Sequence, residues 1–275
     1  MRVVSSRGAA PARHQTPLMG PIALHGGGEF LPGDERFLDE LLSVAGRVAA
    51  ARATDVSSTD LDVAGHAFAS PGVRVAILPT AASRGRPDLS AAQAVTAFEA
   101  RARTVGHPIR IDVARVVDED SADDPDVAEI IASADLAYLP GGDPDIVPGL
   151  LSWTATGEAL AAAHKRGAVI AGASAGAMGL ADWSWTSHGG IRGLGFVHGI
   201  IVVPHYDEVR RMAWQTGLEK VAPPGVGYLG LDERTGVISG DDGWRVAGEG
   251  AAYWFPPDRV FPIVGRHGER IDLPS

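Results

Sequence analysis

Cysteine is absent from this chain of 275 residues. Its absence excludes disulfide bonds, thiolate metal ligands and a cysteine nucleophile. The sequence also lacks any apolar run of about 18 residues, the length that a membrane-spanning helix requires. Residues 1–16 lack the apolar stretch of a secretory signal peptide. We therefore expect a cytoplasmic protein that has no membrane partner.

Basic residues are outnumbered by acidic ones, 24 against 34, which gives a formal net charge of −10. Binding to a phosphate backbone requires a basic stripe, so nucleic acid is not an expected partner. Hydrophobic residues make up 45% of the chain and charged residues 21%, as in ordinary globular proteins. A substantial core is therefore expected, but no interface can be identified, so monomer and homodimer both stay open.

The domain organisation follows from composition. Residues 1–20 are rich in Ser, Arg, Pro and Gly without periodicity, and we interpret them as a flexible tail. Residues 21–275 contain no internal repeat and no domain-sized linker, which favours one α/β domain.

Strand and helix patterns alternate through the first two thirds of the chain. Strands are predicted at 21–25, 73–79, 109–113, 136–140 and 169–173, and helices at 34–51, 90–105, 126–132 and 157–166. This alternation predicts an α/β three-layer sandwich, with a mostly parallel central sheet flanked by helices. The last third adds strands at 200–204, 227–231 and 236–239 and a hairpin of 245–246 with 251–255, so extra antiparallel strands are expected towards the C-terminus.

The strongest local signal is the segment Gly172–Gly176, in which Ser174 stands between two glycines after an apolar strand. A Gly-x-Ser-x-Gly turn between a strand and a helix lifts a serine hydroxyl clear of the sheet. It also aims the following N–H, that of Ala175, at an incoming carbonyl oxygen. The alternative is a serine that merely caps a helix. The preceding strand favours Ser174 as a nucleophile.

A second turn, Pro140–Pro144, follows the strand predicted at 136–140. Ligands of open parallel sheets gather at the C-terminal ends of the strands. The Gly141-Gly142 pair can supply a second backbone donor there, whereas the simpler interpretation is an ordinary Gly-Asp-Pro turn.

Taken together, these segments resemble the serine peptidase family of aspartyl dipeptidase (dipeptidase E) and cyanophycinase. That family shares its fold with class I glutamine amidotransferases. The matching motifs are Ile22–Glu29, Pro140–Asp143, Gly172–Ala177 and Val203–Tyr206. The stretch Gly230–Glu233 is similar to the cyanophycinase side of the family.

The resemblance implies roles for four residues. Ser174 matches the nucleophile, His205 matches the base, and Gly142 and Ala175 match the backbone donors of the oxyanion hole. Glutamine amidotransferases carry cysteine at the elbow, so serine here points towards hydrolysis rather than amide transfer.

The acid that would orient His205 is less defined. The family places an acidic residue between the serine and the histidine, and Asp182 is the only carboxylate in that interval. Asp182 is therefore our candidate, although it follows the serine more closely than the family leads us to expect. The alternatives are a backbone carbonyl or one of four later carboxylates: Asp207, Glu208, Asp232 and Glu233.

Five further residues are expected to contact substrate: Gly27, Gly141, Asp143, His188 and Arg192. The glycines allow a close backbone approach, and an arginine can bind a substrate carboxylate. No metal-ligand spacing and no complete phosphate-binding motif is present, so neither a metal nor another cofactor is expected.

The function predicted by this resemblance is a serine-type peptidase that cleaves short or unusual peptides through an acyl-enzyme. The substrate would be an aspartyl dipeptide or a cyanophycin-like isopeptide. Two alternatives stay open: an esterase or other acyl hydrolase with the same nucleophile, and a catalytically inactive binding protein of the same fold.

Overall fold

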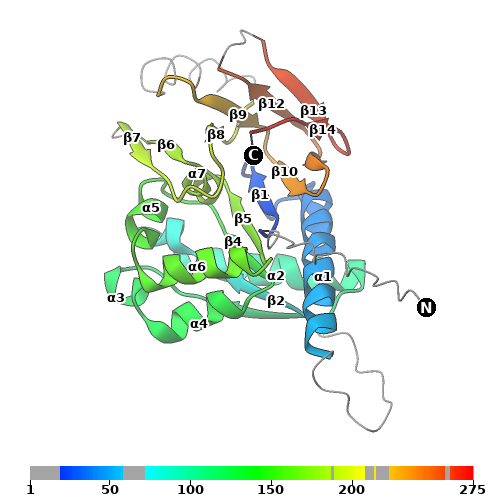
Figure 1. Cartoon of the computed structure of the whole chain (residues 1–275), viewed down its shortest axis with the longest axis vertical. Coiled ribbons are helices and arrows are strands. Elements are labelled where there is room, and N and C mark those ends of the chain that lie inside the picture. Colours follow the sequence, from blue (N-terminus) through cyan, green and yellow to red (C-terminus); the bar gives the residue numbers. More distant parts are fainter. Residues whose placement is uncertain are drawn as a thin grey trace, which may run out of the picture.

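The computed structural model describes residues 19–57, 72–186, 189–207, 214, 223–257 and 261–274. Of the tail expected at 1–20, residues 1–18 lie outside these ranges. Within these ranges the strands form two larger sheets and a two-stranded hairpin, and helices cover the largest sheet (Figure 1). The mixed α/β architecture with extra antiparallel strands towards the C-terminus agrees with the predicted fold class.

The main sheet has eight strands in the order β14-β11-β10-β1-β5-β4-β2-β3. Five neighbours are parallel: β1 (Ile22–His25), β5 (Val169–Ala173), β4 (Leu136–Leu139), β2 (Val73–Ile77) and β3 (Ile109–Val113). Three antiparallel strands extend it: β10 (Thr235–Gly240), β11 (Gly243–Gly248) and β14 (Arg270–Ile271). Because parallel strands end at one edge, the loops after β1, β5 and β4 converge there.

Helices cover both faces of this sheet. One face packs against α1 (Glu35–Ser57) and α2 (Pro87–Val105). The other packs against α3 (Glu119–Ala122), α4 (Pro125–Ser133), α5 (Ile146–Leu151), α6 (Ala155–Lys165) and α7 (Ala175–Leu180). A short 3₁₀ helix, η1 (Thr80–Ala82), follows β2.

The central strands β1, β5 and β4 are buried on both sides, and their successive side chains point to opposite faces. In β1, Ala23 packs towards α1 and α2, whereas Leu24 packs towards the opposite helices. In β4, Tyr138 and Leu139 divide in the same way. This burial explains the continuous apolar runs from which the strands were predicted.

A second sheet has the strand order β13-β12-β9-β8. It consists of β8 (Ile200–Val203), β9 (Gly227–Leu231), β12 (Ala251–Phe255) and β13 (Ile263–Arg266), and only the β8–β9 pair is parallel. The strands β9, β12 and β13 stand at the top of Figure 1, opposite α3 and α4 at the bottom. The chain passes from the second sheet to the first between β9 and β10.

The hairpin predicted for 245–246 and 251–255 is wrong. Strand β11 pairs with β10 and β14, whereas β12 pairs with β9 and β13. Gly248, with φ of 131°, ends β11 where a Cβ atom would lie 2.2 Å from the Arg234 carbonyl oxygen. The glycines at 248 and 250 therefore lead the chain from one sheet to the other.

A separate hairpin of β6 (Trp183–Thr186) and β7 (Gly189–Arg192) was not predicted. Its second strand begins with two glycines, which are depleted in strands. A Cβ atom at Gly190 would overlap the Trp183 ring, at 1.5 Å from Cζ2. Glycine at this position thus lets the tryptophan lie across the neighbouring strand.

Helix α2 begins three residues earlier than predicted, at Pro87 instead of Ser90. Proline suits the first turn of a helix, because its fixed φ is helical and its missing N–H would have no partner there.

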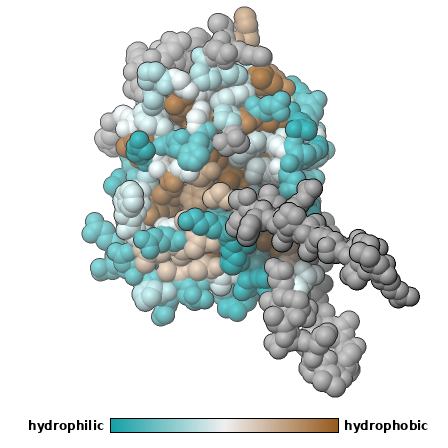
Figure 2. Space-filling view, in the orientation of Figure 1, coloured by the Kyte–Doolittle hydropathy of each residue, from teal (hydrophilic) through white to brown (hydrophobic). Residues whose placement is uncertain are grey.

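Within the described residues, no helix is both long and apolar enough to cross a bilayer. Figure 2 shows one face, hydrophilic along its lower edge and hydrophobic near its centre.

Candidate active site

Ser174 lies at the C-terminal end of β5, half-buried, with φ 49° and ψ −115°. The two flanking glycines make this turn possible. A Cβ atom at Gly172 would lie 2.5 Å from the Gly176 carbonyl carbon, and one at Gly176 would lie 2.1 Å from the Leu139 carbonyl oxygen. The strand, the turn and the following helix therefore have the arrangement that the sequence predicted.

The Ser174 hydroxyl begins a chain of two side-chain hydrogen bonds. Its Oγ lies 2.9 Å from His205 Nε2, and His205 Nδ1 lies 2.8 Å from Glu233 Oε1. The carboxylate accepts from Nδ1–H, so Nε2 is left to accept from the serine. The His205 and Glu233 side chains are partly exposed, at 27% and 32%. This arrangement of nucleophile, base and acid is the one that activates serine hydrolases.

His205 follows β8 of the second sheet and has a φ of 50°. Its N–H donates to the Gly26 carbonyl at 2.7 Å. Gly27, with φ of 95°, faces the imidazole, because a Cβ atom there would lie 2.3 Å from His205 Cε1. The structure thus places Gly27, which we expected to contact substrate, against the histidine ring.

Glu233 lies where the chain passes from β9 to β10. The next residue, Arg234, has a φ of 56° and donates its N–H to the Gly27 carbonyl at 2.7 Å. Gly28 leaves room for the acid, since a Cβ atom at Gly28 would lie 3.1 Å from Glu233 Cβ. The glycine turn after β1 therefore contacts both the histidine and the glutamate.

Asp182 does not orient His205, which corrects the sequence-based candidate. Its carboxylate lies 2.7 Å from His198 Nδ1 and accepts the Gly199 N–H at 2.9 Å. Helix α7 ends at Leu180, so the chain has already left the elbow when it reaches Asp182.

Glu233 was one of four carboxylates that sequence reasoning left open. Of the other three, Asp232 accepts the Ala251 N–H at 2.9 Å. Asp207 lies within the described residues and has an interaction of its own, whereas Glu208 lies outside them. The resemblance of Gly230–Glu233 to the cyanophycinase side of the family was the signal that could have favoured Glu233.

Of the expected oxyanion donors, Ala175 directly follows Ser174, and Gly142 follows Gly141, where a Cβ atom would lie 3.1 Å from Ser174 Cβ. Gly142 has a φ of 159°, and a Cβ atom there would lie 2.1 Å from the Ala81 carbonyl oxygen. The N–H groups of Gly142 and Ala175 donate to no acceptor among the described residues. Both backbone N–H groups are thus without an acceptor among the described residues, and their role as oxyanion donors stays a prediction.

Glu29 is a neighbour of the site that sequence reasoning did not assign to it. Its Oε1 accepts the Gly141 N–H at 2.8 Å. A Cβ atom at Gly141 would lie 2.7 Å from that oxygen and 3.1 Å from Ser174 Cβ. Gly141 therefore lies between Glu29 and the serine.

The Glu29 carboxylate also affects the nearby Tyr138. Burial, with smaller contributions from the Glu29 and Asp34 carboxylates, raises the pKa of Tyr138 well above its usual value.

The remaining predicted substrate contacts are spread more widely. Asp143, which is half-buried, pairs with the exposed Arg84 at 3.2 Å. Arg192 is an exposed residue at the end of β7, where its backbone pairs with Trp183. His188 lies outside the described residues.

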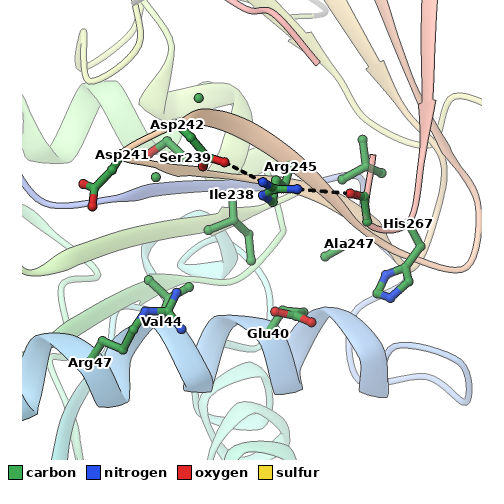
Figure 3. Close-up of a pocket in the computed structure, with 14 residues that line it drawn as sticks. Glu40, Val44, Arg47, Ile238, Ser239, Asp241, Asp242, Arg245, Ala247 and His267 are labelled. Atoms are coloured by element: carbon green, nitrogen blue, oxygen red, sulfur yellow. Dashed lines mark hydrogen bonds and ion pairs between the residues drawn. The ribbon is translucent and has the colours of Figure 1, made fainter. Parts of the chain in front are cut away.

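A cavity of about 430 Å³ lies elsewhere, between α1 and the β10–β11 strands (Figure 3). Glu40 and Arg47 reach it from α1, and Arg245 from β11 pairs with Asp242 at 2.5 Å. This hydrogen bond from Arg245 lowers the pKa of Asp242. The residues that line the cavity do not include Ser174, His205 or Glu233, so the cavity is separate from the candidate active site.

The sequence pattern of peptidase family S51 matches residues 61–246 of this chain. The matched range contains Ser174, His205 and Glu233, and it begins after the glycine turn that follows β1. None of the curated proteins compared with the chain matches it.

Solved structures resemble the fold. A peptidase from an acI-B1 actinobacterium has a TM-score of 0.71 at 23% identity, and the alignment covers 94% of this chain and 99% of that one. A putative peptidase E protein from Listeria monocytogenes EGD-e has a TM-score of 0.52 at 12% identity, with coverage of 84% and 100%. At these identities the likeness concerns the fold.

Proposed function

The chain belongs to peptidase family S51 and is a serine-type peptidase, and from that premise we propose that it cleaves short or unusual peptides through an acyl-enzyme on Ser174. The observation that carries the proposal is the hydrogen-bond chain from Ser174 Oγ through His205 to Glu233, at 2.9 and 2.8 Å.

In the proposed first step, His205 Nε2 removes the hydroxyl proton while Ser174 Oγ attacks the scissile carbonyl carbon. Glu233 holds the ring through Nδ1–H and stabilises the imidazolium that forms. The imidazolium then gives its proton to the leaving amine, and the carbon–nitrogen bond breaks. A water molecule, deprotonated by His205, hydrolyses the resulting ester and restores the serine.

The oxyanion formed in each step would be held by the N–H groups of Gly142 and Ala175. The support for this role is that neither N–H donates to an acceptor among the described residues, that Ala175 directly follows Ser174, and that Gly142 follows Gly141, where a Cβ atom would lie 3.1 Å from Ser174 Cβ. Losing one such donor typically reduces the rate by about 10²- to 10³-fold. The donors are backbone groups, so their position depends on the turns that present them.

The proposed substrates are aspartyl dipeptides or cyanophycin-like isopeptides, as the resemblance to dipeptidase E and cyanophycinase implies. The intact hydrogen-bond chain favours a catalyst over an inactive binding protein, because a binding protein would not need Ser174, His205 and Glu233 to be hydrogen-bonded in this order. The same chemistry cleaves esters, so the experiment must separate the two kinds of substrate.

The test compares the wild-type protein with Ser174→Ala on α-aspartyl dipeptides, β-aspartyl peptides and p-nitrophenyl esters, together with labelling by a fluorophosphonate probe. We expect peptide hydrolysis and labelling by the wild-type protein and neither by the variant. Ser133→Ala, which removes a hydroxyl from α4, is the matched control. Undiminished peptide cleavage by Ser174→Ala would refute the assignment, and wild-type activity on esters alone would refute the peptide substrates.

A further inference from the structure

His25 and Asp34 form a buried pair that the proposed mechanism does not use. Both residues are almost completely inaccessible, at 0% and 1% exposure. His25 Nε2 lies 2.9 Å from Asp34 Oδ1, and the imidazole lies 4.4 Å from the Phe37 ring. Buried polar groups are costly unless they are paired, so this pair requires an explanation.

The pair joins the two ends of the segment between β1 and α1. His25 Nδ1 accepts the Gly27 N–H at 3.3 Å, and Nε2 lies within ion-pair distance of Asp34 Oδ1 without hydrogen-bond geometry. Asp34 Oδ2 accepts the Phe30 N–H at 2.8 Å. Four residues of this segment have positive φ: Gly27 at 95°, Gly28 at 69°, Phe30 at 66° and Gly33 at 99°. The glycines adopt positive φ readily, whereas Phe30 keeps this conformation only where its surroundings hold it.

The same turn holds each segment of the candidate active site. Three successive carbonyl groups, those of residues 25, 26 and 27, accept backbone N–H groups from three separate parts of the chain. The bonds run from Ser174 to His25 at 2.9 Å, from His205 to Gly26 at 2.7 Å and from Arg234 to Gly27 at 2.7 Å.

We propose that His25 and Asp34 are positioning residues, which fix this turn and thereby align Ser174, His205 and Glu233. The inference rests on the proposed function. The pair touches none of the reacting atoms and acts through the backbone of the turn. An apolar pair often stabilises a core as well as a buried ionic pair does, so stability alone does not require these side chains. The directional bonds that hold the turn are those from the Gly27 N–H to His25 and from the Phe30 N–H to Asp34, and Phe30 is the non-glycine residue of the turn with positive φ.

The test uses His25→Leu, His25→Gln and Asp34→Asn in the full chain. Misplacing catalytic groups by about 1 Å costs up to about 10²-fold, so we expect His25→Leu to lower kcat by about 10- to 100-fold while KM changes by less than about 3-fold. The labelling rate of Ser174 by a fluorophosphonate should fall in parallel. His25→Gln, whose amide both accepts and donates, should recover most of kcat, and Asp34→Asn should lie between the two.

His164→Leu is the matched control. This second buried histidine lies 2.8 Å through Nε2 from the Gly20 carbonyl oxygen, at the opposite end of β1 from His25. It should lose thermal stability as His25→Leu does but keep the wild-type kcat. A folded His25→Leu variant with wild-type kcat would overturn the inference. So would a parallel loss of kcat in His164→Leu, or a failure of His25→Gln to recover activity.

A second readout does not require activity. The Nδ1 proton of His205, bonded to a carboxylate, should give a low-field proton resonance that is identified by its loss in Glu233→Gln. We expect Ser174→Ala to retain this resonance and His25→Leu to lose or shift it. If the wild-type protein is inactive, the proposed function fails, and the resonance alone decides the positioning role. An unchanged resonance in His25→Leu would overturn that role.

Discussion

Ser174 and His205 are held at φ values of 49° and 50°, although neither is glycine. Residues in such conformations cost about 1–3 kcal/mol each and persist only when the surroundings hold them. Here the holding groups are backbone hydrogen bonds to the carbonyls of His25 and Gly26. At the scale of the residue, Ser174 and His205, the two residues with proposed roles in proton transfer, therefore depend on the fold to keep their backbone in an unfavourable conformation.

The acid is the residue on which sequence and structure disagree most clearly. Glu233→Gln should lower kcat/KM by about 10²- to 10⁴-fold, because the amide no longer holds His205 in the tautomer that accepts the serine proton. Asp182→Asn should keep near-wild-type kcat/KM, since Asp182 bonds His198 and Gly199 instead. Steady-state kinetics on the best peptide substrate makes the comparison, and the reverse ranking would contradict the structure.

At the scale of the element, side-chain caps determine where several helices begin. Asp124 precedes α4, and its carboxylate accepts the N–H groups of Asp126 at 2.8 Å and Val127 at 3.4 Å. Pro125 occupies the first helical turn, where it needs no N–H partner. Thr154 caps α6 in the same way by accepting the Gly157 N–H at 3.3 Å. These helices cover one face of the sheet and do not touch the candidate active site.

Removal of the α4 cap should therefore reduce stability and leave catalysis unchanged. Asp124→Ala is expected to lower the free energy of unfolding by about 1 kcal/mol and Tm by about 2–4 °C. Glu129→Ala removes a charge from the same helix without removing a cap and serves as the control. Thermal unfolding and kcat/KM should be measured together. A change in kcat/KM, or equal Tm values for the two variants, would contradict this account.

At the scale of the whole molecule, the candidate active site forms where the two sheets meet. Ser174 follows a strand of the main sheet, His205 follows a strand of the second, and Glu233 lies on the connection between them. The last residue of β1 and the glycine turn that follows it bond to all three segments. Neither sheet alone contains the hydrogen-bond chain, so its formation requires both sheets to be folded and docked.

Global stability should also depend on pH through His164. Burial lowers the pKa of this histidine below its usual 6.5, and the hydrogen bond to the Gly20 carbonyl partly offsets the effect. The unfolded chain therefore binds a proton as pH falls through 6.5, before the folded chain does. The unfolded state binds more protons in that range, so stability falls as pH decreases below 6.5.

His164→Gln should weaken this dependence. Between about pH 7.5 and about pH 5.5 the wild-type Tm should fall further than that of the variant, because only the wild-type protein loses the contribution of a buried neutral imidazole. Other titrating groups are common to both proteins and cancel in the comparison. Differential scanning fluorimetry at the two pH values measures it, and equal decreases in Tm would contradict the prediction.

Local sequence determined much of the fold and part of the site. The strand at Val169–Ala173 is confirmed at its predicted bounds. Its signal, an apolar run followed by a turn of small residues, consists entirely of residues that are adjacent in the sequence. The alternation of strands and helices likewise predicted the parallel sheet, since each apolar run is long enough to define one buried element. The position of Ser174 at the elbow was likewise predictable from the residues next to it.

Tertiary structure decided what depends on distant parts of the chain. Glu233 reaches His205 from 28 positions away because β9 lies beside β8, whereas the nearer Asp182 is directed towards His198. The strands β11 and β12 read as a hairpin, yet each finds its partners in a different sheet. Strand pairing and hydrogen bonds between remote segments follow from packing of the whole chain, and the local pattern contains no record of them.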